Sequence, residues 1–232
     1  MKRPLEFFIL LIFAGCSGDT VTTQKGLKQG VILYEISYPK MSDDQFVFPG
    51  MMPETMTIKF KDNKVTGELS LGFSALKTKF ISDSKKHEFA HIVSMANSTF
   101  GVKMTKEEVK EHYAFKPDGM EITETGETTQ VAGYLCKKAK VIFPDATTNF
   151  DIFFTNDLSV KNANWATPFY EIEGILMEYR LNSYNIDMHF KAIEVRKEKV
   201  DDSEFQLPEG ITMMTTEEME EKFFNLNFNN NE

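Results

Sequence analysis

The chain has 232 residues, of which 26 are Lys or Arg and 35 are Asp or Glu, so its formal net charge is −9. Hydrophobic residues make up 41% and charged residues 26%, which excludes a chain that is disordered along its whole length. An acidic chain lacks the clustered Lys and Arg that neutralise phosphates, so we expect no nucleic acid among its partners. Two Cys are too few for a disulfide framework.

The first residues have the features of a bacterial export signal. Two basic residues precede an apolar run from Phe7 to Ala14, which is too short to span a bilayer. Small residues then precede Cys16, as in the lipobox of bacterial lipoproteins, which are cleaved before the Cys and lipidated on it. We therefore predict a signal peptide over 1–15, lipid attachment at Cys16 and a flexible tether over 16–26. An ordinary signal peptide with an incidental Cys is the alternative.

Cys136 is the other Cys of the chain. A lone thiol in an exported protein has no intramolecular partner if Cys16 is acylated. Because Cys136 lies in an apolar strand pattern, we interpret it as a buried small hydrophobic residue rather than a reactive thiol.

After the tether, most of the chain alternates between polar and apolar residues, as β-strands do. In Gly30–Tyr38, for example, Ile32, Tyr34 and Ile36 are expected to share one face. Alternation with one polar face predicts an antiparallel sheet that buries its other face. The expected strands are 30–38, 56–61, 65–73, 77–82, 88–95, 120–125, 131–143, 149–155, 175–181 and 186–197.

Two capping boxes predict helices. Thr105 with Glu108 begins a helix that we expect to end near Tyr113. Thr215 with Glu218 begins another, followed by apolar residues at helical spacing. Both helices are short, so they are additions to a structure made mainly of strands.

We expect one domain over 27–226, followed by a frayed tail at 227–232. Its predicted fold class is α+β, with a large curved antiparallel sheet that forms an open β-barrel and two or three helices packed on it. Such a sheet surrounds an apolar cavity or groove. The apolar segment 43–55 is expected to form a loop or lid between strands.

Several segments resemble a known family. Gly133–Ala139 reads Gly-Tyr-Leu-Cys-Lys-Lys-Ala, and Ser203–Pro208 reads Ser-Glu-Phe-Gln-Leu-Pro. With segments 30–36, 164–168 and 174–179, they resemble an uncharacterised family of exported bacterial proteins labelled domain of unknown function 4412. That family is similar in outline to the lipoprotein-carrier (LolA/LolB-like) fold, an open β-barrel with helices as a lid. The resemblance implies an apolar cavity and no known reaction, and a function taken from it is an analogy.

The stretch from His87 to His91 matches the His-Glu-x-x-His motif of zinc hydrolases. On a helix, the two imidazoles bind one zinc ion and Glu88 acts as general base. On a strand, His87 and His91 lie about 13 Å apart, too far to share one ion. The family resemblance places the stretch among strands, so a zinc hydrolase is the least favoured function, and we expect no metal or other cofactor.

The function expected from these features is non-catalytic. We expect an exported, membrane-anchored lipoprotein, at the outer membrane of a Gram-negative bacterium, that binds a lipid or other hydrophobic molecule. The predicted ligand-binding residues are Phe60, Leu69, Leu71, Phe80, Trp165, Phe169, Met177 and Met188. The alternative is an envelope structural or adaptor protein with a fully packed core, whose apolar segment Phe46–Met52 docks an envelope protein partner.

Overall fold

The computed structural model describes residues 25–39, 52–71, 76–144, 148–183, 186–219 and 221–222. The predicted signal peptide, Cys16 and the tail at 227–232 lie outside these residues, as does most of the tether and of the segment 43–55. Within the described residues, no helix has both the length and the apolar composition needed to cross a membrane.

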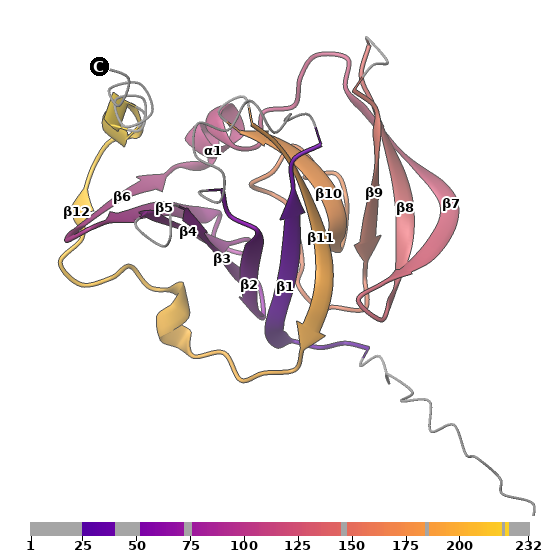
Figure 1. Cartoon of the computed structure of the whole chain (residues 1–232), viewed down its shortest axis with the longest axis horizontal. Helices are drawn as coiled ribbons and strands as arrows, with labels where there is room; N and C mark the ends of the chain where they lie inside the picture. The colour runs from indigo at the N-terminus through magenta and orange to yellow at the C-terminus, as the bar shows by residue number, and fades with distance from the viewer. Residues whose placement is uncertain are drawn as a thin grey trace, which may run out of the picture.

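One sheet contains all twelve described strands (Figure 1). The strands are β1 (Gln29–Ser37), β2 (Thr55–Lys61), β3 (Lys64–Leu71), β4 (Leu76–Asp83), β5 (Glu88–Met95), β6 (Ser98–Met104), β7 (Glu121–Val131), β8 (Tyr134–Ile142), β9 (Phe150–Thr155), β10 (Ile175–Ser183), β11 (Ile186–Arg196) and β12 (Thr212–Met213). Their order in the sheet is β12-β6-β5-β4-β3-β2-β1-β11-β10-β9-β8-β7. Neighbours are antiparallel except β12, which runs parallel to β6.

The sheet curves strongly but has two ends, β12 and β7, in the part of the chain that the structure describes. The fold is therefore mainly β, with one large sheet that is not closed into a barrel there. In Figure 1, β7, β8 and β9 form one arm, and β3 to β6 fan out as the other. β7 is exposed along most of its length and carries Glu121, Glu124 and Glu127, whose charges discourage pairing with another chain.

The predicted strand over 131–143 is two strands in the structure. Val131 ends β7, and Tyr134 begins β8. Ala132 and Gly133 between them both have positive φ, of 46° and 83°. Two such residues form the tight turn that joins hairpin strands, so the chain reverses where the apolar pattern alone suggested continuation.

Two strands were not predicted. β6 contains Ser98, Thr99 and Gly101, residues that are typical of turns, although its inner face carries apolar side chains in alternation. β12 has two residues and exists only because it pairs with β6. The other predicted strands are confirmed: 88–95 has both ends as predicted, and each of the rest has at least one shifted end.

The helices are short. α1 (Lys106–His112) has the predicted capping box, in which Thr105 accepts a hydrogen bond from the Glu108 backbone N–H, and the Glu108 carboxylate accepts one from the Thr105 backbone N–H. Residues 216–219 and 221–222 are helical, and Glu218 and Thr215 make the same reciprocal bonds. A 3-10 helix, η2 (Asp202–Phe205), lies in the segment between β11 and β12.

The C-terminal segment after β11 crosses the outer face of the sheet. Phe205, Leu207 and Ile211 pack there against buried side chains of β4 and β5. Gly101 of β6 permits this approach, because a Cβ at that position would lie 2.4 Å from the Ile211 side chain. The segment therefore covers part of the outer face that strand alternation alone leaves exposed.

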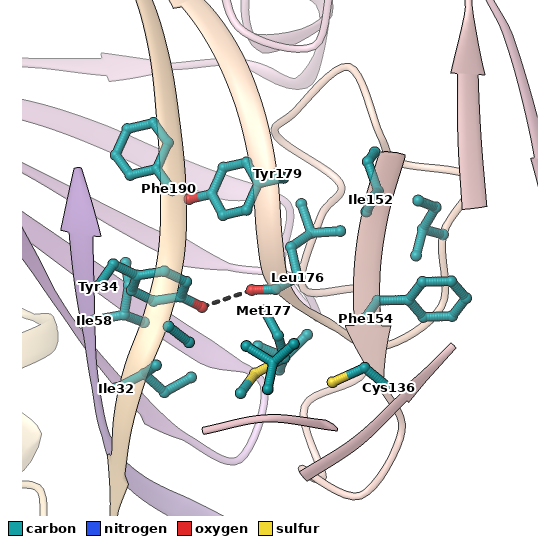
Figure 2. Packing of buried hydrophobic residues seen from close by; sticks show 14 of the residues in the cluster. Ile32, Tyr34, Ile58, Cys136, Ile152, Phe154, Leu176, Met177, Tyr179 and Phe190 are labelled. Carbon is teal, nitrogen blue, oxygen red and sulfur yellow. Dashed lines mark hydrogen bonds between the residues drawn. The ribbon is translucent and has the colours of Figure 1, made fainter. Parts of the chain in front are cut away.

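The larger hydrophobic core, here named the first core, fills the inside of the curve between β1, β2 and β8 to β11 (Figure 2). Ile32, Phe60, Cys136 and Met177 have no exposed area. Cys136 is a free thiol, and burial raises its pKa to about 11. The interpretation of Cys136 as a buried hydrophobic residue is confirmed.

Candidate functional site

A second group of apolar side chains lies on the inner face of β4, β5 and β6, and we name it the aromatic cluster. Phe80, Phe89 and Phe100 come from β4, β5 and β6 in that order. Tyr113 follows α1, and Trp165 lies in the connection between β9 and β10. Strand pairing and one long connection thus bring together residues from five places in the chain.

Phe89 is the centre of the aromatic cluster. Its ring stacks on Phe80 with 6.2 Å between centroids, and it lies 4.8 Å from Tyr113 and 6.5 Å from Trp165. The indole N–H of Trp165 donates a hydrogen bond of 2.7 Å to Ser82 Oγ on β4. These contacts fix the ring planes of Phe80, Phe89, Tyr113 and Trp165, whereas the Phe100 ring has the Lys222 ammonium group 4.0 Å from its centroid.

The most buried rings of the first core differ in exposure from those of the aromatic cluster, although Phe143, Phe150 and Phe153 at the edge of the first core are also partly exposed. In the first core, Tyr34, Phe169 and Phe190 are 2–3% exposed. In the aromatic cluster, only Phe89 is buried, whereas the other four rings are partly exposed. A hydrophobic molecule would therefore find apolar contact area at the aromatic cluster without displacing core side chains.

His91 is the polar member of this region. Its Nε2 lies 2.6 Å from Thr78 Oγ1, and its Nδ1 lies 2.6 Å from the Tyr113 hydroxyl. Burial lowers the pKa of His91 to about 4, so the imidazole is neutral at physiological pH. The three residues form a hydrogen-bonded row that joins β4, β5 and the end of α1.

The helical geometry of a His-Glu-x-x-His zinc site is not present. Glu88–Met95 is strand β5, as the family resemblance favoured, and His87 has a positive φ of 55° in the preceding turn. The His87 ring meets the edge of Trp165, with 5.2 Å between centroids. The residues that the structure describes contain no group of three His, Cys, Asp or Glu that could hold a metal ion.

The predicted ligand-binding residues fall into two groups. Phe60, Phe169 and Met177 are buried in the first core, and Leu69 and Met188 are partly buried against it. Phe80 and Trp165 belong to the aromatic cluster, and Phe80 also contacts the first core. The side chain of Leu71 and all of Cys16 lie outside the described part of the chain.

Three residues of the aromatic cluster were not singled out from the sequence. Phe89 and Phe100 alternate correctly with their neighbours, but nothing local shows that β5 and β6 line the same surface as Trp165. Tyr113 ends a predicted helix, and its role depends on α1 folding back onto β5. The alternation of Phe100, Val102 and Met104 is the signal that would have found β6.

A polar concave feature lies on the outer face. It is an open hollow of about 290 Å³, lined by Glu54, Thr55, Thr57, Lys59, Thr66, Glu68, Ser70, Lys79 and Glu204. Lys59 and Lys79 both bind the carboxylate of Glu204, which belongs to η2. The lining is polar throughout, so this hollow does not have the chemistry expected of a site for a hydrophobic ligand.

A family model described as "Domain of unknown function (DUF4412)" matches residues 45–167, which is more than half of the chain. The matched range contains every residue of the aromatic cluster. No curated protein matches the chain.

Proposed function

This chain belongs to the DUF4412 family, and from that premise we propose that it is an exported lipoprotein that binds a lipid or other hydrophobic molecule without catalysing a reaction. Acyl chains on Cys16 hold it at the cell envelope, in the outer membrane of a Gram-negative bacterium. The curved sheet serves as the open barrel of a lipoprotein-carrier (LolA/LolB-like) architecture, with α1 and the C-terminal helical residues at its mouth.

The partial exposure of the aromatic cluster carries this proposal. Rings of Phe, Tyr and Trp offer large apolar contact areas, and their planes are held by Phe89 and by the bond from Trp165 to Ser82. We assign the ligand contacts to Phe80, Phe100 and Trp165. Phe60, Phe169 and Met177 then support the sheet from the first core and do not touch the ligand.

The filled first core favours the second candidate, an envelope adaptor. A protein whose interior is packed can act through its surface alone. The docking segment predicted for this role, Phe46–Met52, lies outside the described residues except for Met52. The two candidates differ in one measurable property, which is whether the purified chain carries a hydrophobic molecule.

Native mass spectrometry tests the proposal. The mature chain from Ser17 onward is exported with a signal peptide that is not lipidated and is purified without detergent, so that any adduct is a ligand and not the anchor. We expect an adduct of lipid mass in the wild-type chain. It should be lost in Trp165→Ser and Phe100→Ser, and retained in Tyr170→Ser, whose ring is exposed and outside the aromatic cluster.

Two outcomes would contradict the proposal. An adduct that persists in all three variants places the ligand elsewhere in the molecule. A wild-type chain without any adduct favours the adaptor. Circular dichroism melting of each variant establishes that it is folded before its mass spectrum is compared.

A further inference from the structure

Five segments meet at the end of the sheet where the described chain begins, and we name this region the basic end. It consists of 25–29, 61–64, 83–87, 157–161 and 196–202. Hydrogen bonds join these segments in series: Gly26 N–H donates to Asp157 O, Asp62 N–H to Lys28 O, and Ser84 N–H to Asn63 O. Ser84 Oγ donates to Lys161 O, and Val200 N–H donates to Gln29 Oε1. The basic end is therefore one continuous surface.

The charge of the basic end is opposite to that of the whole chain. Its five segments contain ten of the 26 Lys and Arg residues but only six of the 35 Asp and Glu residues, so their formal charge is +4 against −9 for the chain. Five of its lysines are exposed and have no carboxylate within 4 Å among the described residues. They are Lys28, Lys85, Lys161, Lys197 and Lys199.

The basic end also lies nearest to the proposed anchor. Lys25 follows Cys16 by nine residues, which span at most about 30 Å when fully extended. An acyl group on Cys16 therefore keeps this end of the domain close to the bilayer surface. The rest of the chain is acidic, so an anionic bilayer attracts this end and repels the other faces.

We infer that the basic end is a docking surface for anionic phospholipid headgroups, which orients the anchored domain on the membrane. This inference rests on the proposed lipid anchor at Cys16. The occupant is a lipid surface because the chain outside the described residues leads there and because the lysine ammonium groups complement phosphate charge. His87 in the β4–β5 turn touches Trp165, so the basic end borders the aromatic cluster, and docking places that cluster beside the bilayer.

Fluorescence quenching on vesicles tests the orientation of the lipidated full chain. Ser159→Cys places a label on the basic end, and Ser98→Cys places one at the β5–β6 turn, at the opposite end of β5. Both serines are exposed, whereas the native Cys136 is fully buried, so we expect the label to react at the introduced cysteine. The quencher is a nitroxide on the headgroup of phosphatidylcholine. The vesicles contain phosphatidylcholine alone or a mixture with phosphatidylglycerol.

We expect the label at position 159 to be quenched about twofold more than the label at 98 on phosphatidylglycerol vesicles, and this difference to vanish at high salt. The double substitution Lys85→Glu with Lys161→Glu should abolish it. Lys77→Glu with Lys140→Glu is the matched control, because both lysines are exposed and have no ion-pair partner among the described residues. Equal quenching of the two labels would overturn the inference, as would a difference in quenching that is the same with and without phosphatidylglycerol.

Sedimentation with vesicles tests separately whether Cys16 carries the proposed acyl group. A chain that does not sediment with pure phosphatidylcholine vesicles lacks the proposed acyl group, whatever the labels report. In that case, sedimentation with phosphatidylglycerol vesicles measures the membrane binding that the basic end provides without an acyl group. Binding that the Lys85→Glu and Lys161→Glu pair removes supports the inference, and no binding overturns it.

Discussion

The hydroxyl of Tyr34 donates a hydrogen bond of 2.6 Å to the backbone carbonyl of Leu176, although 142 residues separate the two in sequence (Figure 2). Tyr34 is on β1 and Leu176 on β10, and β11 lies between these strands in the sheet. The strand partner of Tyr34 on β11 is Ala192, whose small side chain leaves room for the tyrosine ring to cross it. The curvature of the sheet brings β1 and β10 within reach.

Removing this hydroxyl should destabilise the fold. Tyr34 is 2% exposed, so in Tyr34→Phe the Leu176 carbonyl loses a partner that water cannot replace. We expect the free energy of unfolding to fall by about 1–3 kcal/mol in urea denaturation. Tyr170→Phe is the control, because Tyr170 is 45% exposed and its substitution should change stability little. Equal stability of the two variants would show that the buried bond contributes nothing.

Met177 and Trp165 should respond differently to substitution. Met177 is fully buried in the first core, so Met177→Ala should leave a cavity and lower the free energy of unfolding by about 2–5 kcal/mol. Trp165 is partly exposed, so Trp165→Ser should cost less stability, and it should also remove the proposed ligand. Denaturation and native mass spectrometry on the same samples separate the two effects. If Met177→Ala loses the adduct and Trp165→Ser keeps it, the ligand lies in the first core.

Gly67 makes room for the ring of Phe80. It lies on β3 between its strand partners Ile58 and Phe80, and a Cβ there would be 2.2 Å from the Phe80 ring and 2.7 Å from Ile58. Gly67→Ala should therefore overpack the inner face and cost about 1–3 kcal/mol of stability. Phe80→Leu should restore part of this loss in the double variant. A fully additive effect in the double-mutant cycle would mean that the two residues do not compete for space.

His91 should make the stability of the fold depend on pH. Its folded pKa of about 4 lies below the unfolded value of about 6.5, so the unfolded chain binds the proton more tightly. The stabilisation is complete above pH 6.5 and is lost as the pH falls towards 4. Between pH 7 and pH 5 we expect a loss of about 2 kcal/mol, which His91→Gln should remove. Urea denaturation at pH 7 and pH 5 measures this loss. If the free energy of unfolding of His91→Gln depended on pH as strongly as that of the wild type, the prediction would be contradicted.

Acid should also loosen the C-terminal segment. The hydrogen bond from Lys59 holds the pKa of Glu204 below its ordinary value, as that from Lys61 does for Asp202. Folded pKa values below the unfolded ones mean that these contacts stabilise the fold above the ordinary carboxyl pKa and are lost as the pH falls through the folded values. We expect hydrogen exchange at 202–213 to quicken in acid more than in β1. In Glu204→Gln it should already be fast at neutral pH, and slow exchange there would disprove the role of this ion pair.

Most strands could be predicted because alternation is a local property of the sequence. Glu88–Met95 was predicted with both ends correct, and α1 followed from its capping box. The split at Ala132 and Gly133 was missed because Val131 to Phe143 is apolar enough to pass as one strand. The edge strand β7 was predicted too short, because its exposed residues on both faces give no alternation.

The candidate site was predicted only in part. The sequence identified Phe80 and Trp165, but it grouped them with Phe60 and Met177, which the structure places in the first core. Alternation shows which face of a strand is apolar. It does not show whether the curved sheet buries that face in the first core or leaves it partly exposed. The aromatic cluster depends on contacts of Phe89 with Tyr113, which follows α1, and with Trp165 in the β9–β10 connection. No local sequence pattern predicts these two positions.

The sequence by itself determined where most strands lie, which face of each strand is apolar, how α1 begins and that Cys136 is buried, because each depends on neighbouring residues. Only the tertiary structure decided which rings are filled core and which stay partly exposed. It also decided that Glu204 binds Lys59 and Lys79, across 145 and 125 residues of chain, and that dispersed lysines gather at the basic end. These contacts depend on strand order and on the twist of the sheet, which bring together residues that are far apart in sequence.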